Sequence, residues 1–372
     1  MNVPKLRFKE FNDEYNVLKL SDVAELTSSK RIYLSDYTDN GIPFYRGKEI
    51  SELKLNKPVS DLLYISDEKY KEIEAKYGVP KENDILVTGV GTLGNIYRIP
   101  NNNKFYFKDG NLIWLKNIKQ NSEYLEYNLE FNKKKLLDSA IGSTQKALTI
   151  AGLNKLSFYY PSTSEQTKVA RTMQLIDIKI NLQSKKVEDL KLFKLYIRNK
   201  IFSGIKTKDK IINTLNYEQP NRYIVKSDDY LNDENLIPVL TANKAFILGY
   251  CNEDDYYNKG DVIIFDDFTM DSKYVNFNFK IKSSAIKLLT QKNNNNLKYI
   301  FECLQALNLE STEHKRHYIS IVQEIEIPVP DIIVQNKIAN LMFTYDKKIK
   351  LESDNYNKLI ELKKGLMQNM FV

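Results

Sequence analysis

The fold is decided by two matching stretches: residues 161–202, PSTSEQTKVARTMQLIDIKINLQSKKVEDLKLFKLYIRNKIF, and residues 330–371, PDIIVQNKIANLMFTYDKKIKLESDNYNKLIELKKGLMQNMF. They align without a gap at an offset of 169 residues, and 13 of the 42 positions are identical. Neither stretch has a proline after its first residue. Apolar side chains recur at alternating steps of four and three, which predicts long helices with a heptad seam. The chain therefore carries one unit twice, and each copy ends in such a helix.

Each predicted helix has one apolar stripe, and polar residues interrupt both stripes at the same two steps: Gln183 with Glu352, and Lys194 with Lys363. This favours an antiparallel coiled coil over two independent surface helices, because each helix follows a globular segment and the chain must return. Residues 166–202 would form a helix of about 55 Å. The predicted seam residues are Val169, Met173, Ile176, Ile180, Val187, Leu190, Ile197, Ile338, Met342, Tyr345, Ile349, Tyr356, Leu359 and Leu366.

The segments before the helices are rich in β-branched and aromatic residues and resemble each other faintly. Four short matches follow one another in the same order: 42–44 with 237–239, 84–87 with 261–264, 107–108 with 279–280, and 150–158 with 319–327. We expect an α+β fold with an internal pseudo-two-fold repeat. Its predicted parts are a β-rich domain (1–160), a central helix (161–206), a second β-rich domain (207–329) and a C-terminal helix (330–372).

Composition limits the classes of protein. At 372 residues the chain is too long for one core, and 42% hydrophobic with 28% charged residues predicts folded domains. Two cysteines and two histidines exclude a disulfide framework and a four-ligand zinc site. No run of about 18 apolar residues occurs, so we expect a soluble, cytoplasmic protein without a membrane contact. The net charge of +7 resides on the two helical segments, while the two domains carry +3 and −3.

Two sequence motifs suggest enzymatic chemistry, and their context argues against it. GVGTLG (89–94) matches G-x-G-x-x-G, but a short β-branched stretch ended by Pro100 follows it. A dinucleotide site needs a helix there, so we expect a glycine-rich turn between strands. The acid pairs at 254–255 and 266–267 lack further metal ligands at a recognisable spacing and are expected to be solvated loop acids. The chain alone is predicted to be neither an enzyme nor a metal or cofactor binder.

Polar loops precede the last strand of each domain at corresponding positions. The first is GSTQKALT (142–149) and the second is STEHKRHY (311–318). Their hydroxyl, amide and basic side chains suit phosphates and base edges. Ordinary polar loops are the alternative for any one residue.

Four stretches (18–26, 42–50, 141–180 and 329–353) resemble the specificity (S) subunits of type I restriction-modification systems, as does the two-fold layout. The resemblance implies two target recognition domains, each reading half of a bipartite site in double-stranded DNA. It also implies that the two helices set the spacing and dock two methyltransferase (modification) subunits, alongside restriction/translocase subunits. S-adenosylmethionine, ATP and magnesium would belong to those partners. The second domain begins with NYEQPNRYIV (216–225) where the family pattern has LSDVAEL.

Candidate DNA-binding residues lie in the predicted loops of both domains. A coiled-coil scaffold joining two protein-binding domains, without nucleic acid, is the alternative function. The helical cations Lys179, Lys185, Lys186, Lys191, Arg198 and Lys200 would either face a modification subunit or be solvated. The predicted DNA contacts are Arg46, Lys48, Thr92, Asn95, Thr144, Gln145, Lys146, Thr241, Asn243, Lys244, Asp267, Thr269, Lys273, His314, Lys315 and Arg316.

Overall fold

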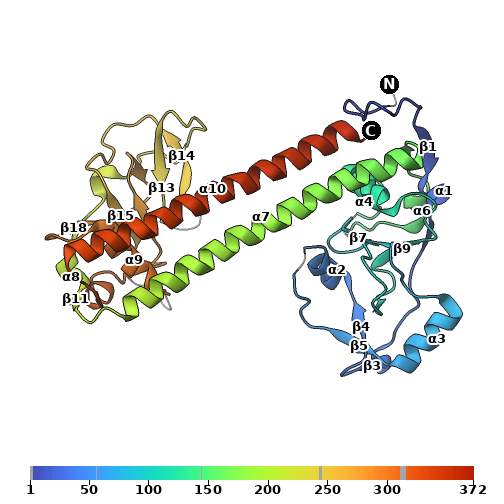
Figure 1. The fold of residues 1–372 in the computed structure, drawn as a ribbon, viewed down its shortest axis with the longest axis horizontal. Helices are drawn as coiled ribbons and strands as arrows, with labels where there is room; N and C mark the ends of the chain where they lie inside the picture. Colours follow the sequence, from blue (N-terminus) through green and yellow to red (C-terminus); the bar gives the residue numbers. More distant parts are fainter. Residues whose placement is uncertain (1–2, 56, 144, 243–244, 311–315) are drawn as a thin grey trace. The chain divides into compact units, whose positions relative to one another are not determined.

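The computed structural model describes residues 3–55, 57–143, 145–242, 245–310 and 316–372. The chain divides into two compact units (Figure 1). Unit 1 comprises Met1–Leu182 and Tyr356–Val372, and unit 2 comprises Gln183–Asn355. Each unit therefore holds one β-rich domain and part of each long helix.

Unit 1 is built on an antiparallel sheet of order β2-β9-β6-β7. Its central strands β6 (Ile85–Thr88) and β9 (Leu112–Lys116) are almost fully buried apolar runs, with Leu86 opposite Trp114. A second sheet has the order β3-β5-β4-β8, in which β4 (Ile42–Tyr45) and β8 (Tyr106–Phe107) run parallel, and a third pairs β1 with β10. The other elements are β1 Asn16–Lys19, α1 Leu20–Val23, β2 Glu25–Thr27, β3 Tyr37–Thr38, α2 Gly47–Lys54, β5 Leu63–Ile65, α3 Asp67–Tyr77, β7 Ile96–Arg98, α4 Ser122–Phe131, α5 Lys133–Asp138, α6 Ile150–Asn154 and β10 Ser157–Tyr160.

Unit 2 repeats this arrangement in a reduced form. Its sheets have the orders β12-β18-β15-β16, β14-β13-β17 and β11-β19, and β13 pairs with β17 in parallel. The central strands are β15 (Val262–Asp266) and β18 (Ile286–Gln291). The other elements are β11 Lys208–Lys210, α8 Ile211–Thr214, β12 Leu215–Glu218, β13 Ile237–Leu240, β14 Ile247–Cys251, β16 Ser272–Val275, β17 Lys280–Ile281, α9 Leu297–Ala306 and β19 Glu326–Pro328.

The repeat is confirmed at the level of elements, but two of the short matches are wrong in register. β4 and β8 pair Phe44 with Tyr106, whereas β13 and β17 pair Val239 with Lys280, so Tyr106 corresponds to Lys280. The match of 107–108 with 279–280 is therefore displaced by two residues. The same comparison applies to the central strands. Thr88 of β6 pairs with the first residue of β9, and Asp266 of β15 pairs with the first residue of β18, so Thr88 corresponds to Asp266. The match of 84–87 with 261–264 is displaced by one residue, which would exchange the two faces of the strand.

The long helices are α7 (Thr163–Ser203) and α10 (Ile332–Met370), and they pack antiparallel in each unit. In unit 1 Lys363 donates to Asp177 at 2.5 Å. In unit 2 Lys194 donates to Asp346 at 2.6 Å, which is the same pair at the repeat offset. Gln183 donates to the carbonyl and carboxylate of Glu352 at 2.8 and 2.7 Å. No predicted seam residue is exposed: Val169, Met173, Ile176, Ile180, Ile338 and Met342 are buried, and Val187, Leu190, Ile197, Tyr345, Ile349, Tyr356, Leu359 and Leu366 are half-buried.

A glutamine in the first turn joins each long helix to its own domain. Gln166 donates to the carbonyl of Pro161 at 2.9 Å and accepts from the backbone N–H of Asn121 at 3.1 Å. Gln335 makes the same two bonds in unit 2, to Pro330 and from Asn296, both at 2.9 Å. The repeated proline and glutamine thus satisfy otherwise unpaired backbone groups where two helices begin.

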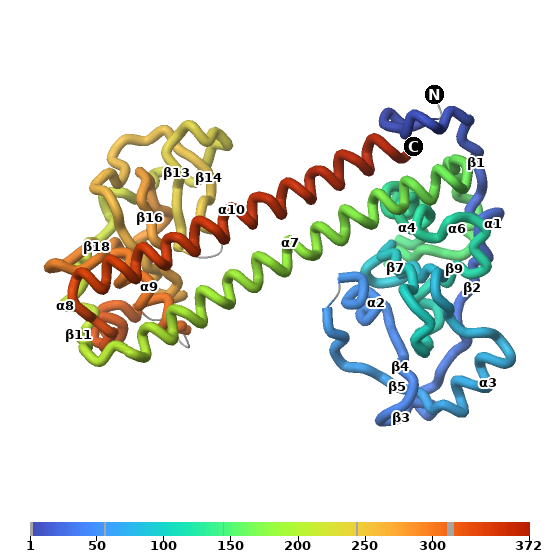
Figure 2. The backbone as a smooth tube through the Cα atoms, viewed as in Figure 1, coloured from blue at the N-terminus to red at the C-terminus, as the bar shows by residue number. Residues whose placement is uncertain are grey.

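The two ends of the chain meet in unit 1 (Figure 2). The N–H of Leu6 donates to the carbonyl of Asn369 at 2.8 Å, and Arg7 forms two bonds of 2.8 Å with the buried Glu165 at the start of α7. The last residues of α10 belong to the main core of this unit. Within the described part of the chain, no helix combines the length and hydropathy needed to cross a membrane.

Candidate nucleic-acid interface

In the first domain, three predicted residues line one open pocket of about 590 Å³ at the N-terminal end of α2. Arg46, Lys48 and Thr92 share its wall with the small residues Gly47 and Gly91, and with Ser51, Thr88 and Asn111. The lining is mixed, with the apolar side chains of Leu55 and Val90 beside the cations and the carboxylate of Glu52. Because backbone and short side chains form much of it, a flat ligand edge can approach closely.

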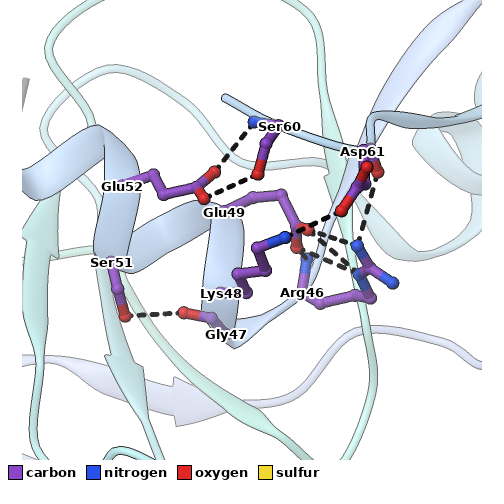
Figure 3. A network of polar contacts seen from close by, with 8 residues as sticks. All are labelled: Arg46, Gly47, Lys48, Glu49, Ser51, Glu52, Ser60 and Asp61. Carbon is purple, nitrogen blue, oxygen red and sulfur yellow. Dashed lines mark hydrogen bonds and ion pairs between the residues drawn. The ribbon is translucent and has the colours of Figure 1, made fainter. Parts of the chain in front are cut away.

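A polar network holds Arg46 at the rim of this pocket (Figure 3). The side chain of Arg46 donates from Nε to both carboxylate oxygens of Glu49 at 3.1 Å, and from Nη2 to Oε1 at 2.5 Å. Its backbone N–H donates to the same carboxylate at 2.7 Å, which closes the first turn of α2. Burial alone would raise the pKa of Glu49, but the hydrogen bonds from Arg46 outweigh it and hold the pKa below its usual value. The pair is therefore charged at neutral pH.

Asp61 completes the network from the segment before β5. Lys48 donates to its carboxylate at 2.8 Å, and Nη2 of Arg46 donates to its carbonyl at 3.3 Å. A second carboxylate, Glu52, accepts from the N–H and hydroxyl of Ser60 at 2.9 and 2.8 Å (Figure 3). These bonds tie the segment around Ser60 and Asp61 to the first turns of α2.

The glycine-rich motif forms the turn between β6 and β7, as its sequence context predicted. Thr88 donates its hydroxyl to the carbonyl of Thr92 and accepts from the N–H of Asn95. Asn95 in turn donates to Ser51 of α2 at 2.8 Å. Thr92 is exposed, whereas Asn95 is half-buried and committed to these bonds.

Gly89 connects this turn to the polar loop 142–149. Its carbonyl accepts from the N–H of Leu148 at 2.9 Å, and its N–H donates to Asn111 at 2.8 Å. A Cβ at Gly89 would lie 3.3 Å from the carbonyl oxygen of Leu148, so a side chain would push the loop away. Gln145 and Lys146 are exposed on this loop.

In the second domain, two buried aspartates at the end of β15 hold the turn after the strand and the polar loop before the last strand. Asp266 accepts from the N–H groups of Phe268 and Thr269, both at 2.9 Å, and so shapes the turn after the strand. Asp267 accepts from the N–H groups of His317 and Tyr318 at 2.9 and 2.7 Å. His317 stands at the position of Leu148 in the repeat. Both domains therefore anchor the same loop at the same place.

The burial of Asp266 and Asp267 corrects two predictions. They are 9% and 2% exposed, so they are not solvated loop acids, and the carboxylate of Asp267 is not presented to a base edge. Asp267 also lies 3.6 Å from the buried ammonium of Lys287. Burial lowers the pKa of Lys287, and the charge of Asp267 opposes this shift. Asp267 therefore has a structural task at this site.

Among the described second-domain candidates, only some lie at this anchor. Thr269 and Arg316 are exposed beside the Asp266–Asp267 anchor. Lys273 lies on β16, in a separate pocket of about 350 Å³ with Gln305 of α9 and Asn308, which follows that helix. Thr241 is 7% exposed, so it is a poor candidate for a base contact. Thr144, Asn243, Lys244, His314 and Lys315 lie outside the described residues.

Sequence reasoning missed the residues that position these side chains. Glu49, Asp61 and Ser51 form the polar network around the start of α2. Of these, only Glu49 could have been identified from the sequence, because it stands three residues after Arg46 at the start of a helix. Asp266 was weighed as a metal ligand and expected to be a solvated loop acid. No group of three or more histidine, cysteine, aspartate or glutamate side chains among the described residues is placed to hold a metal ion.

The long helices expose many apolar side chains away from their seam. On α7 these residues are 38–64% exposed, and on α10 they are 38–64% exposed as well. Arg198, which was predicted to be solvated or partner-facing, is buried and donates to the carbonyl of Gln305, so it packs within unit 2. The exposed apolar residues are Leu175, Ile178, Leu182, Leu192, Phe193, Leu195 and Tyr196 on α7, and Ile333, Leu341, Phe343, Leu351, Ile360 and Leu362 on α10.

Comparison with known proteins gives a consistent result. A family model described as type I restriction modification DNA specificity domain matches residues 12–192 and again 201–362. The type I restriction enzyme EcoR124I/EcoR124II specificity subunit of Escherichia coli is 44% identical over 140 residues, which cover 34% of this chain and 34% of that protein. The MjaVIII specificity subunit of Methanocaldococcus jannaschii is 26% identical over 205 residues, 54% of this chain and 48% of that protein. The matched stretches thus span a third to a half of these relatives.

Solved structures show the same fold. The type I restriction-modification S subunit from M. genitalium superposes with a TM-score of 0.68 and 16% identity, covering 100% of this chain and 99% of that one. A chain from a structural study of complex assembly and conformational transition in the type I system gives 0.58 and 13%, with coverage of 97% and 98%.

Proposed function

Because the chain belongs to the type I restriction modification DNA specificity family, we propose that it is the sequence-reading subunit of a type I restriction-modification complex. One observation carries the proposal: the family domain occurs twice, once at 12–192 and once at 201–362. Each copy has its own loop anchor at the end of β6 or β15. Each domain would read one half of a bipartite site in double-stranded DNA.

Direct reading would fall to polar side chains at the start of α2 and on the loops. In the first domain these are the half-buried Arg46 and the exposed Lys48, Thr92, Gln145 and Lys146, and in the second the exposed Thr269 and Arg316. Cations suit phosphates and guanine, and the amide of Gln145 suits adenine. The family membership favours this role over a scaffold without nucleic acid.

The helix pair would set the separation of the two half-sites and dock two modification subunits. Apolar side chains exposed along α7 and α10 support this role, because a partner would remove them from water. Lys179, Lys185, Lys191 and Lys200 are exposed around them, and Lys186 is exposed while paired with Glu352 at 2.6 Å. Methyl transfer from S-adenosylmethionine, and cleavage using ATP and magnesium, would be the work of the modification and restriction subunits.

The test is expression of the chain with its modification subunit in a host that lacks adenine methylation, followed by mapping of methylated bases. We expect one bipartite motif with two fixed half-sites and a constant gap. A host expressing the modification subunit alone should remain unmethylated. A scaffold role would instead give a stable complex with the modification subunit and no motif.

A further inference from the structure

We propose that Arg46 reads a guanine in the half-site of the first domain and that Glu49 is the residue that positions it. This inference rests on the proposed function. It specifies which base is read, which domain reads it, and which residue orients the arginine.

Hydrogen bonds fix the orientation of the Arg46 guanidinium and leave one of its nitrogens free to donate to a ligand. Nε and Nη2 are committed to Glu49 and to the carbonyl of Asp61. Nη1 forms no hydrogen bond with the residues that the structure describes, and Figure 3 shows one guanidinium nitrogen without a partner. The side chain of Arg46 is 34% exposed and that of Glu49 is 0% exposed. A long side chain that normally samples many rotamers is thus held in one, which lowers the entropy lost on binding.

The charge balance suits a base contact better than a phosphate contact. Glu49 neutralises Arg46, and Asp61 pairs with Lys48, so the rim of the pocket has little net charge. Attraction to phosphates depends on net positive charge and counterion release, which such pairs weaken. A directed N–H donor keeps its geometric selectivity in spite of the neutralisation.

Guanine is the base that this donor fits. The Nη1 amino group can donate a hydrogen bond here, and the major-groove edge of guanine offers two neighbouring acceptors, O6 and N7. Adenine replaces one of these acceptors with an amino donor, which would face the cation unfavourably. Cytosine and thymine present a single polar group each on this edge.

The pocket leaves room for a base edge beside Arg46. Gly47 and Gly91 stand on its wall. A Cβ at Gly91 would meet no atom within 4 Å, and one at Gly47 would meet only Thr88, at 3.8 Å. The pocket that Arg46 lines is therefore open beside these two glycines.

At the position that corresponds to Arg46, the second domain has no arginine. Arg46 follows β4 directly, and the residue that follows the corresponding strand β13 is Thr241. Thr241 is buried, and its backbone N–H is bonded to Phe246 at 2.9 Å. The effect of Arg46 should therefore be confined to one half-site.

The experiment uses the complex of the full chain with its modification subunit. The mapped site is placed in a set of duplexes in which each base pair is changed singly, and the methylation rate of each duplex is measured. The variants are R46A, R46K, E49Q and, as a matched control, E72Q, since Glu72 pairs with Lys76 on α3 and does not line the pocket. Thermal unfolding of each variant is recorded.

We expect the wild type to prefer guanine at one position of one half-site by roughly 5- to 10-fold, the lower end of the range for a bidentate arginine–guanine pair, because only Nη1 is free to donate. R46A and R46K should reduce that preference to about threefold or less and leave every other position unchanged. E49Q should reduce it partly, because the arginine regains its rotamers, and E72Q should leave it intact. A preference that survives R46A and R46K, or a uniform loss at all positions, overturns the inference even if E49Q fails to fold. If the wild-type complex methylates no duplex, the proposed function itself fails.

Discussion

Lys146 and Arg46 represent two kinds of cation in the same interface. Lys146 is exposed on an anchored loop and forms no ion pair within the described part of the chain. Its charge is available to a phosphate, unlike that of Arg46. We predict that K146A lowers affinity for all duplex sequences alike and makes the slope of log K against log salt shallower by about 0.9. Titrations of the assembled complex at four or more salt concentrations measure this.

The control for this prediction is K119A. Lys119 is also exposed, but it lies beyond the C-terminal end of β9, whereas Asn111 of the pocket precedes its N-terminal end. At about 3.3 Å per strand residue, Lys119 lies well away from the pocket. Equal salt slopes for K146A and the wild type would show that Lys146 of this loop does not contact a phosphate.

Asp267 is the residue on which the second recognition loop depends. It bonds two backbone N–H groups and faces the buried ammonium of Lys287. We predict that D267A lowers the free energy of unfolding by about 3 kcal/mol, because it leaves a buried charge and two donors without partners. The double variant D267A/K287M should recover part of this loss, since it removes the unpaired charge.

Denaturant unfolding and hydrogen exchange at residues 316–322 measure both effects. D267N, which keeps one acceptor oxygen, should be milder than D267A. If D267A and wild type exchange at the same rate in this segment, the anchor is not what holds the loop.

At the scale of elements, the helix pair is fastened in unit 2 by a charged cluster. Asp346 of α10 accepts from Lys194 of α7 at 2.6 Å and from Lys298 of α9 at 2.8 Å, and Lys298 also pairs with Glu302. Burial would raise the pKa of Asp346, but the bonds from the two lysines outweigh it and lower the pKa. The carboxylate therefore stabilises the folded state above its unfolded pKa of about 3.9, and this contribution is lost as the pH falls through the lower folded value.

We predict that D346N lowers the stability of the chain by about 1 kcal/mol at pH 7, a modest value because Asp346 is 38% exposed. The difference from wild type should shrink below about pH 4. Urea unfolding at a series of pH values provides the measurement. D189N changes an exposed aspartate of α7 and should show neither effect. A D346N penalty that stays constant from pH 7 to pH 3 would contradict the role of the ionised group.

The sequence predicted the long helices and their seam well because a heptad pattern over many turns has only one consistent register. It predicted the repeat of short strands but misplaced two of them, by one and by two residues. A strand such as β6 or β15 is buried on both faces, so its run of apolar residues carries no alternation from which a register could be read.

Only part of the candidate site could be predicted, because some of its residues act through contacts between segments far apart in the sequence. Arg46, Lys48 and Thr92 could be proposed from residue type, and the structure brings them to one pocket. Glu49 acts on Arg46, its neighbour in the first turn of α2, whereas Asp267 acts through hydrogen bonds to partners that the fold supplies. For Asp267 these partners are 50 residues away in the chain, and no local pattern signals such a bond.

For the whole molecule, the length of the helix pair should appear in the DNA site. The pairs Asp177–Lys363 and Lys194–Asp346 fasten the helices, and 16 residues separate these anchors in each helix. Seven residues inserted between the anchors in both helices would retain the seam, because seven residues are close to two helical turns. They would add about 10 Å, which corresponds to at most about three base pairs of duplex.

We predict that this matched insertion widens the gap of the methylated motif by one to three base pairs, about the added rise, and leaves both half-sites unchanged. Methylation mapping with the modification subunit measures the gap directly. An insertion in α7 alone should abolish methylation, because the two anchor pairs can then no longer form together. If the complex that carries the matched insertion still methylates the original motif with its original gap, the helices do not set the spacing. The separation of the half-sites must then be fixed by the modification subunits.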